Sequence, residues 1–210
     1  RSGHVSGGVW FIFGIGKKRI LFTGDMTRDP VLLERDEPEK ADAAIVNCAY
    51  AGKSINQRKQ YETLLFSVKE SLDKGGKVLL PLPATGRGSD IYLYHSRELK
   101  GCDIFVEQAI LNECRKLLSQ TAWIKSSSLK PANASASVKT VRNDAERKAA
   151  ADFDTPAVYL SPDGMLTTSE ALYYYSRFKS DPNSRIIITG HTAAGTMGAN
   201  ILDPKYRQEN

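Results

Sequence analysis

The sequence predicts an α/β protein in which helices cover a parallel sheet, with a β-hairpin at the start of the chain. Between residues 77 and 189, short segments made wholly of apolar residues alternate with amphipathic segments. Strands without polar alternation are typical of a sheet that is buried on both faces, as parallel sheets are. The start of the chain instead holds two β-branched or aromatic runs around a glycine-bearing turn, which indicates an antiparallel hairpin.

The composition is that of an ordinary globular protein. The chain has 210 residues, 41% of them hydrophobic, which is enough for one good core and a smaller second piece. No apolar run approaches the roughly eighteen residues that span a bilayer, so we expect a cytoplasmic protein without a membrane partner. Because the chain begins with Arg1 and not with Met, we expect a piece of a longer polypeptide. The cysteines, which form no CxxC pair, are expected to be reduced core thiols: Cys48, Cys102 and Cys114.

The hairpin is expected from strands at Val9–Phe13 and Arg19–Thr23, joined by a turn at Gly14–Lys18. In an antiparallel pair, the residue that enters the first strand lies beside the residue that leaves the second. We therefore expect His4 and Asp25 to lie close together. An imidazole nitrogen and a carboxylate are ligands that zinc accepts, so the pair is a candidate metal site. A surface histidine and a turn-forming aspartate are the alternatives.

The elements after the hairpin are expected in a regular order. A charged connector at Pro30–Lys40 leads to a buried strand at Ala41–Val46, which ends at Asn47. Apolar residues at helical spacing predict a helix over Ile55–Lys74, ended by two glycines. Strands are then expected at Lys77–Leu82, Asp103–Val106, Ala157–Ser161 and Arg185–Thr189, helices at Ser89–Leu99, Gln108–Ser119 and Thr167–Phe178, and a surface loop at Ser126–Val138.

In such a Rossmann-like sheet, function collects in the loops after the carboxyl ends of the strands. Three of these loops are rich in Gly, Pro, Ser and Thr: Pro81–Gly88, Ser161–Met165 and Thr189–Asn200. Their backbone amides, with Arg87 beside them, suit phosphate groups. The glycine spacing is not the G-x-G-x-x-G of dinucleotide-binding proteins, so a nucleotide-binding α/β domain is a weaker alternative.

Positive charge is concentrated in one segment. The chain carries a net charge of +5, and residues 115–148 alone hold eight basic side chains against Asp144 and Glu146. A basic surface of this kind suits a polyanion such as RNA, and a solvated helix face is the alternative. Arg58 and Glu62 are four residues apart on a predicted helix and are expected to form a structural ion pair.

Several motifs, taken in order, give the chain a resemblance to a known family. GHVSGG contains His4 and LFTGDM contains Asp25, and INQRKQYETLL, GGKVLLPLPATGR, AVYLSPDGML and IIITGHTAAGTMG follow. The chain resembles the metallo-β-lactamase family with a β-CASP domain, the RNA-processing hydrolases of the ribonuclease J and polyadenylation-endonuclease type. The resemblance implies part of a metallo-β-lactamase αββα sandwich over residues 1–50, a β-CASP domain over residues 51–203, and a return to the first domain at residues 204–210.

The resemblance also implies a site. It makes His4 a terminal metal ligand and Asp25 a catalytic carboxylate that bridges two metal ions, which are expected to be Zn²⁺. The metals would activate a water for attack on the phosphodiester. The residues expected to bind single-stranded RNA are Gly86, Arg87, Ser161, Gly195, Thr196 and His191. His191 stands where the family commonly has an aromatic residue, and a loop histidine without a role in binding is the alternative.

Two departures from the family bear on activity. Its histidine-rich motif, His-x-His-x-Asp-His, is absent from the sequence, so we expect the other ligands from the rest of the polypeptide or from a partner chain, a second copy included. Asn47 stands where the family has an acidic residue, and a neutral amide cannot accept a proton. The leading hypothesis, which the resemblance implies, is a zinc-dependent ribonuclease. An inactive RNA-binding β-CASP scaffold and a small-molecule metallo-hydrolase are the alternatives.

Overall fold

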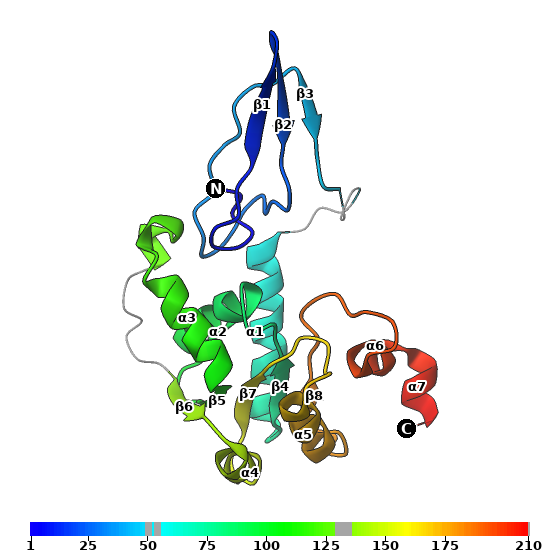
Figure 1. The fold of residues 1–210 in the computed structure, drawn as a ribbon. Coiled ribbons are helices and arrows are strands. Elements are labelled where there is room, and N and C mark those ends of the chain that lie inside the picture. The colour runs from blue at the N-terminus through cyan, green and yellow to red at the C-terminus, as the bar shows by residue number, and fades with distance from the viewer. Residues whose placement is uncertain (49–51, 53–55, 129–135, 210) are drawn as a thin grey trace. The chain divides into compact units, whose positions relative to one another are not determined.

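The computed structural model describes residues 1–48, 52, 56–128 and 136–209 (Figure 1). The chain forms two compact units: unit 1 contains Arg1–Thr63 and Lys116–Lys130, and unit 2 contains Leu64–Arg115 and Pro131–Asn210. Each unit has a β-sheet of its own. No helix in the described ranges is long and apolar enough to cross a membrane.

The sheet of unit 1 has the strand order β1-β2-β3. β1 (Phe11–Ile15) and β2 (Lys18–Phe22) are antiparallel, which confirms the predicted hairpin. The turn is tighter than predicted, because the strands pair to their ends and leave only Gly16 and Lys17 between them. Gly16 has a φ of 59°, and two-residue hairpin turns need a residue in this left-handed conformation.

β3 (Ala43–Ile45) runs parallel to β2. The sequence predicts a buried strand here, and this prediction is wrong: all three residues are exposed, Ile45 at 56%. Aromatic side chains of the hairpin are exposed as well, Phe13 at 47% among them. A wholly apolar strand is buried only where a second layer covers it, and the pattern of one segment contains no information about that layer.

The sheet of unit 2 has the strand order β6-β5-β7-β4-β8, and all its described pairings are parallel. Val158 and Leu160 on one face of β7 and Tyr159 on the other are all at most 1% exposed. The predicted α/β fold with a buried parallel sheet is confirmed. The strands are β4 (Val78–Pro81), β5 (Asp103–Glu107), β6 (Ser137–Val141), β7 (Ala157–Ser161) and β8 (Arg185–Ile186).

The helices lie close to the predicted positions, with additional short ones. The described helices are α1 (Gln57–Asp73), α2 (Arg87–Glu98), α3 (Gln108–Leu118), α4 (Asp144–Ala151), α5 (Ser169–Phe178), α6 (Met197–Leu202) and α7 (Pro204–Glu209), with 3₁₀ turns at Thr121–Trp123 and Ser126–Ser128. The sequence prediction omitted α4, although Asn143 caps it by accepting a hydrogen bond from the Glu146 amide at 2.9 Å.

The loop predicted at Ser126–Val138 is wrong at its end. Ser137 and Val138 belong to β6, which pairs with β5, while residues 129–135 lie outside the described residues. The polar residues of β6 hide its strand character, because Ser137 and Lys139 interrupt the apolar run that a buried strand shows. Pairing with a neighbouring strand outweighs the local pattern at this sheet edge.

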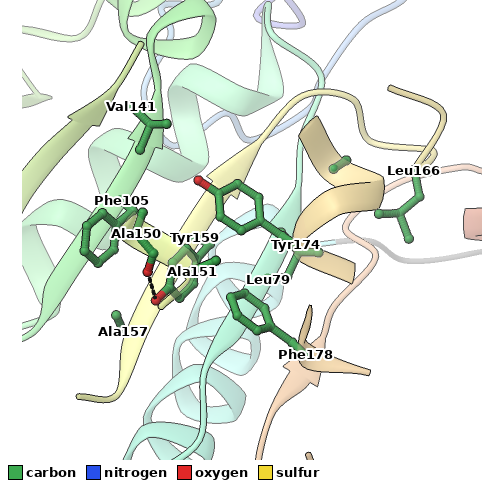
Figure 2. Close-up of a cluster of buried hydrophobic side chains, with 11 residues drawn as sticks. Leu79, Phe105, Val141, Ala150, Ala151, Ala157, Tyr159, Leu166, Tyr174 and Phe178 are labelled. Carbon is green, nitrogen blue, oxygen red and sulfur yellow. Dashed lines mark hydrogen bonds between the residues drawn. The ribbon is translucent and has the colours of Figure 1, made fainter. Parts of the chain in front are cut away.

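The core on one face of the unit 2 sheet is built around Tyr159 (Figure 2). Its ring stacks on Phe105 at a centroid distance of 5.1 Å and contacts the rings of Tyr174 and Phe178 at 5.1 and 4.7 Å. The Tyr159 hydroxyl donates a hydrogen bond of 2.8 Å to the carbonyl oxygen of Ala150. Because the polar end of this side chain is satisfied, its large ring can be fully buried.

The cysteines only partly follow the prediction of core thiols. Cys114 is buried, and burial raises the pKa of its thiol to about 11. Cys48 is exposed, so the prediction is wrong there, and Cys102 is intermediate. All three are free thiols, as expected.

Candidate functional site

The structure brings His4 and Asp25 together in unit 1. Nε2 of His4 lies 3.9 Å from Oδ2 of Asp25, which confirms the proximity predicted from the hairpin. Nδ1 of His4 lies 3.3 Å from the hydroxyl oxygen of Thr27. The side-chain amide of Asn47 donates a hydrogen bond to Oδ1 of Asp25. His4, Asp25 and Asn47 therefore form one polar cluster at the base of the hairpin, and their roles as metal ligands and degenerate acidic position stay predictions.

Backbone contacts hold the segments that carry this cluster. The amide of Ser2 donates to the carbonyl of Gly8 at 2.8 Å, which closes the His4 loop, and the amide of Thr27 donates to the carbonyl of Ser2 at 3.1 Å. Gly3 has a φ of 70°, and a Cβ placed there would lie 2.9 Å from Cγ of Pro30. Position 3 therefore needs glycine for both its conformation and its space.

The His4–Asp25 geometry fits one shared metal ion. Protein ligands lie about 2.0–2.2 Å from zinc, so two ligands of the same ion are at most about 4.4 Å apart. The 3.9 Å between Nε2 of His4 and Oδ2 of Asp25 is within this limit, and both side chains are accessible, at 40% and 63% exposure. The described residues contain no group of three or more His, Cys, Asp or Glu side chains that could hold a metal. The pair fits as part of a zinc site that needs further ligands.

In unit 2, the three glycine-rich loops meet at the carboxyl ends of β4, β7 and β8. Nη1 of Arg87 donates a hydrogen bond of 2.9 Å to the carbonyl of Thr189. The amide of Gly198 donates to the carbonyl of Met165 at 2.8 Å. A Cβ placed on Gly164 would lie 3.2 Å from Cδ of Pro83. The structure thus joins loops that are far apart in the sequence, as expected for a parallel sheet.

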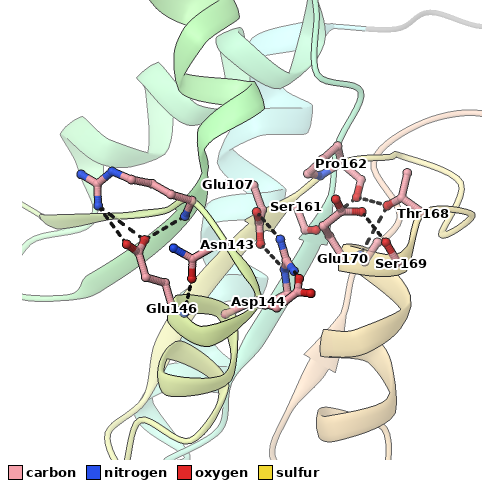
Figure 3. Close-up of polar contacts among 12 residues, drawn as sticks. Glu107, Asn143, Asp144, Glu146, Ser161, Pro162, Thr168, Ser169 and Glu170 are labelled. Carbon is pink, nitrogen blue, oxygen red and sulfur yellow. Dashed lines mark hydrogen bonds and ion pairs between the residues drawn. The ribbon is translucent and has the colours of Figure 1, made fainter.

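The predicted RNA-binding residues differ in how accessible the structure leaves them. Ser161 is fully buried, and its hydroxyl donates to the carbonyl of Pro162 at 3.1 Å (Figure 3). The Thr196 hydroxyl donates to the carbonyl of Ala193 at 2.7 Å and accepts from the amide of Ala199. Three others are more accessible: Gly86 is half-buried, and His191 and Gly195 are exposed. The structure groups all of these in unit 2, and their role in binding RNA stays a prediction.

Asp163 organises the loop after β7, a role that the sequence did not indicate. Its Oδ1 accepts hydrogen bonds from the amides of Met165 and Thr167 at 3.1 and 2.9 Å, and its Oδ2 accepts from the Thr167 hydroxyl. Burial raises the pKa of Asp163, but these hydrogen bonds outweigh burial and lower the pKa below its usual value. An ionised Asp163 therefore holds this loop in shape.

The basic segment predicted to attract RNA does not form one free surface. Arg147 is only 8% exposed and makes two hydrogen bonds to the buried carboxylate of Glu107 at 2.7 and 3.0 Å (Figure 3). Lys139 pairs with Asp103 at 3.0 Å. The segment is also divided between the two units, because Lys116–Lys130 belongs to unit 1. The positive charge counted along this segment is therefore larger than the charge that is free to attract a ligand, because carboxylates neutralise part of it.

Comparison with known proteins assigns the family. A family model described as the Beta-Casp domain matches residues 90–201, more than half of the chain. Endoribonuclease ysh1 of Schizosaccharomyces pombe is 24% identical over 220 residues, which cover 96% of this chain and 28% of that protein. An RNase J-like protein of Methanocaldococcus jannaschii is 26% identical, with 95% and 50% covered. Cleavage and polyadenylation specificity factor subunit 3 of Dictyostelium discoideum is 24% identical, with 96% and 28% covered.

This chain thus spans between 28% and 50% of the length of these three relatives. The match to the Beta-Casp model covers most of unit 2, including the loops that follow β7 and β8. The chain belongs to the metallo-β-lactamase β-CASP family of RNA-processing proteins.

Proposed function

We propose that the protein is a zinc-dependent ribonuclease of the β-CASP type, to which this chain contributes two metal ligands and loops that bind RNA. The observation that carries the proposal is the 3.9 Å approach of Nε2 of His4 to Oδ2 of Asp25. The family assignment supports it, as do relatives named as endoribonucleases. The proposal includes a metallo-β-lactamase part at residues 1–50, a β-CASP domain at residues 51–203, and a cytoplasmic location.

The chain's own groups orient the metal ligands. When Nδ1 of His4 carries the proton, it donates to the Thr27 hydroxyl, and this tautomer has a lone pair on Nε2, the atom that faces Asp25. Asn47 holds Oδ1 of Asp25 and leaves Oδ2 on the His4 side. Zinc bound there supplies Lewis acidity and a nucleophilic water at neutral pH. His4 must be neutral and Asp25 ionised to act as ligands.

The loops of unit 2 supply the groups proposed to hold the RNA backbone. Arg87 uses Nη1 on the Thr189 carbonyl, and its other N–H groups suit a phosphate. Gly195 has a φ of 83°, and a Cβ placed there would meet nothing within 4 Å, so a strand of RNA can approach its backbone closely. His191 and Thr196 lie in the same loop.

The proposal predicts that His4→Ala removes metal and cleavage together. In the purified protein, loss of a zinc ligand is expected to lower the bound zinc and to reduce RNA cleavage by at least roughly 100-fold. His191→Ala is the matched control, because this histidine is exposed and belongs to unit 2, and it is expected to keep its zinc. Metal analysis and cleavage of a labelled single-stranded RNA measure both. Equal zinc content in the two variants would contradict the proposal.

A second candidate function is an RNA-binding scaffold without cleavage, and the contact between Asn47 and Asp25 favours it. An amide at this position cannot accept the proton that an acidic residue would take. If the protein is such a scaffold, the zinc-loaded wild type binds RNA without cleaving it, and Asn47→Glu produces cleavage. Cleavage by the wild type that Asn47→Glu leaves unchanged would dismiss the scaffold.

A further inference from the structure

Unit 1 contains a polar pocket that lies apart from the His4–Asp25 pair and that no sequence motif indicated. Its volume is about 340 Å³, which lies at the lower end of the range of small-ligand sites. Pro30, Val31 and Asn56 contribute to its wall. The charged side chains that line it are Arg28, Arg35, Arg58 and Lys125, with Asp29 and Glu34. Cations therefore outnumber carboxylates in the lining, four to two.

The pocket's cations are weakly neutralised from within. Arg28 and Asp29 approach only to 3.8 Å, with side chains 87% and 67% exposed, so water screens this pair. Lys125 donates a hydrogen bond to the carbonyl of Pro30, and the part of the chain that the structure describes provides no ion-pair partner for its charge. Arg35 pairs with Glu37, which does not line the pocket.

Arg58 is the least engaged of the four. The sequence predicts an ion pair between Arg58 and Glu62, and this prediction is wrong, since the described residues include no ion-pair partner for Arg58. The side chain is exposed on the first turn of α1, a turn that contains no acidic residue. The positive end of the helix dipole therefore adds to the charge of Arg58.

Hydrogen bonds donated by backbone amides hold the frame of the pocket. The amide of Val31 donates to Oε1 of Gln57 at 2.7 Å, which ties the loop after β2 to the start of α1. The amide of Lys125 donates to the carbonyl of Leu32 at 3.0 Å. Asn56 caps α1 by accepting from the amide of Lys59 at 2.9 Å. Three segments distant in sequence are thus fixed around the cavity, so its cations converge before a ligand binds.

The pocket shares its loop with the candidate metal ligand. Arg28 follows Asp25 by three residues, which places their Cα atoms at most about 11 Å apart. On the His4 side, Gly3 packs closely against two residues of the pocket lining. A Cβ at position 3 would lie 2.9 Å from Cγ of Pro30 and 3.0 Å from Cβ of Arg35. A strand of RNA with one phosphate at the His4–Asp25 pair can therefore place another phosphate in this pocket.

We propose that this pocket binds a backbone phosphate of the RNA, next to the phosphate held at the His4–Asp25 pair. The proposal rests on the proposed ribonuclease or scaffold function. Arginine guanidinium groups match phosphate oxygens in a bidentate geometry, and the uncompensated charge disfavours neutral and cationic ligands. The pocket would hold the strand in register without taking part in cleavage.

The test compares Arg58→Gln and Arg28→Gln with Lys59→Gln in the purified protein. Lys59 is exposed on the same turn of α1 and does not line the pocket, so it is a matched control. Binding of a labelled ten-nucleotide single-stranded RNA is measured by fluorescence anisotropy over a series of salt concentrations. Each pocket variant is expected to weaken binding roughly three- to tenfold and to reduce the slope of log K against log salt by about 0.7, the value for one lost phosphate contact with single-stranded nucleic acid. Lys59→Gln is expected to leave both quantities near those of the wild type.

The outcomes separate the pocket from the function on which it rests. If the wild type binds no RNA, the proposed function fails. If the wild type binds RNA and the pocket variants behave like Lys59→Gln, the pocket assignment fails and the function stands. A parallel titration with inorganic phosphate identifies the source of the phosphate: loss of phosphate binding in Arg58→Gln with unchanged RNA binding would assign the pocket to a free anion and overturn the proposal. All substituted side chains are exposed, and circular dichroism verifies that the variants are folded.

Discussion

At the scale of the residue, His95 is a titratable side chain that the fold removes from water. It is fully buried in α2, with Nδ1 at 2.9 Å from the carbonyl oxygen of Ile91 and no partner for Nε2 in the described residues. Burial lowers the pKa of His95 from 6.5 to about 4, and this effect outweighs the hydrogen bond to Ile91, which raises the pKa. In the folded protein, the imidazole of His95 is therefore neutral at neutral pH.

This burial makes the stability of the protein depend on pH. Between pH 6.5 and 4 the unfolded chain takes up a proton that the folded chain does not, so the free energy of unfolding falls as the pH falls through this window. The expected loss is on the order of 3 kcal/mol at pH 4. Urea denaturation measures it, with His95→Leu as the comparison, because leucine does not titrate. The same slope in both proteins between pH 6.5 and 5 would contradict the assignment to His95.

At the scale of the element, close backbone contacts fix the loops that follow the strands of unit 2. α2 begins beside the loop after β4, because a Cβ placed on Gly88 would overlap the carbonyl oxygen of Pro83. α6 begins beside the loop after β7, because Gly198 would bring a Cβ to 2.7 Å from the carbonyl oxygen of Met165. Both glycines therefore allow a helix to begin in close contact with a loop. The contact at Gly88 sets the position of Arg87, the residue before it.

Gly88→Ala is expected to destabilise unit 2. The added methyl group overlaps a backbone oxygen that has no flexible end, and overpacking of this kind costs roughly 1–3 kcal/mol. Gly14→Ala is the control, since a Cβ there meets nothing within 4 Å. Hydrogen exchange of the β4 and β7 amides reports the loss. If the two variants lose equal protection in these strands, the contact with Pro83 does not set the geometry.

At the scale of the whole molecule, each unit is assembled from two separate stretches of the chain. In unit 1 the second stretch supplies Ile124, which is 2% exposed and forms a bridge with Leu33, also 2% exposed. Leu32 accepts the hydrogen bond of Lys125 beside them. The part of unit 1 that contains the His4–Asp25 pair and the pocket therefore depends on a segment from much later in the chain.

Ile124→Ala is expected to loosen unit 1 and to leave unit 2 intact. Truncation of a buried isoleucine costs about 2–5 kcal/mol. Hydrogen exchange read by mass spectrometry distinguishes the units: amides of residues 31–35 are expected to lose protection, whereas those of β7 are expected to keep it. Val138→Ala, at a 39% exposed position in unit 2, is the control. Equal loss in both units would show that they unfold as one.

The sequence predicted what depends on local pattern and on topology. Apolar runs located the strands, as for Ala157–Ser161, and the antiparallel hairpin brought His4 near Asp25. It could not predict features that arise when distant segments meet, such as the pocket between Arg28 and Lys125 or the burial of Arg147 against Glu107. The exposure of β3 could not be predicted for the same reason. A strand is buried only when a second layer packs on it, and the sequence pattern of the strand does not show whether that layer is present.

The strand order of unit 2 determines when its sheet can form during synthesis. β7 lies between β4 and β5, so these two strands cannot join before the later part of the chain has been synthesised. The second stretch of unit 1, Lys116–Lys130, precedes β7 in the chain. During synthesis, unit 1 can therefore close while Leu64–Arg115 is still a flexible loop, at an entropic cost that grows only slowly with loop length. The His4–Asp25 pair and the pocket of unit 1 can then form before the loops of unit 2 that contain Arg87.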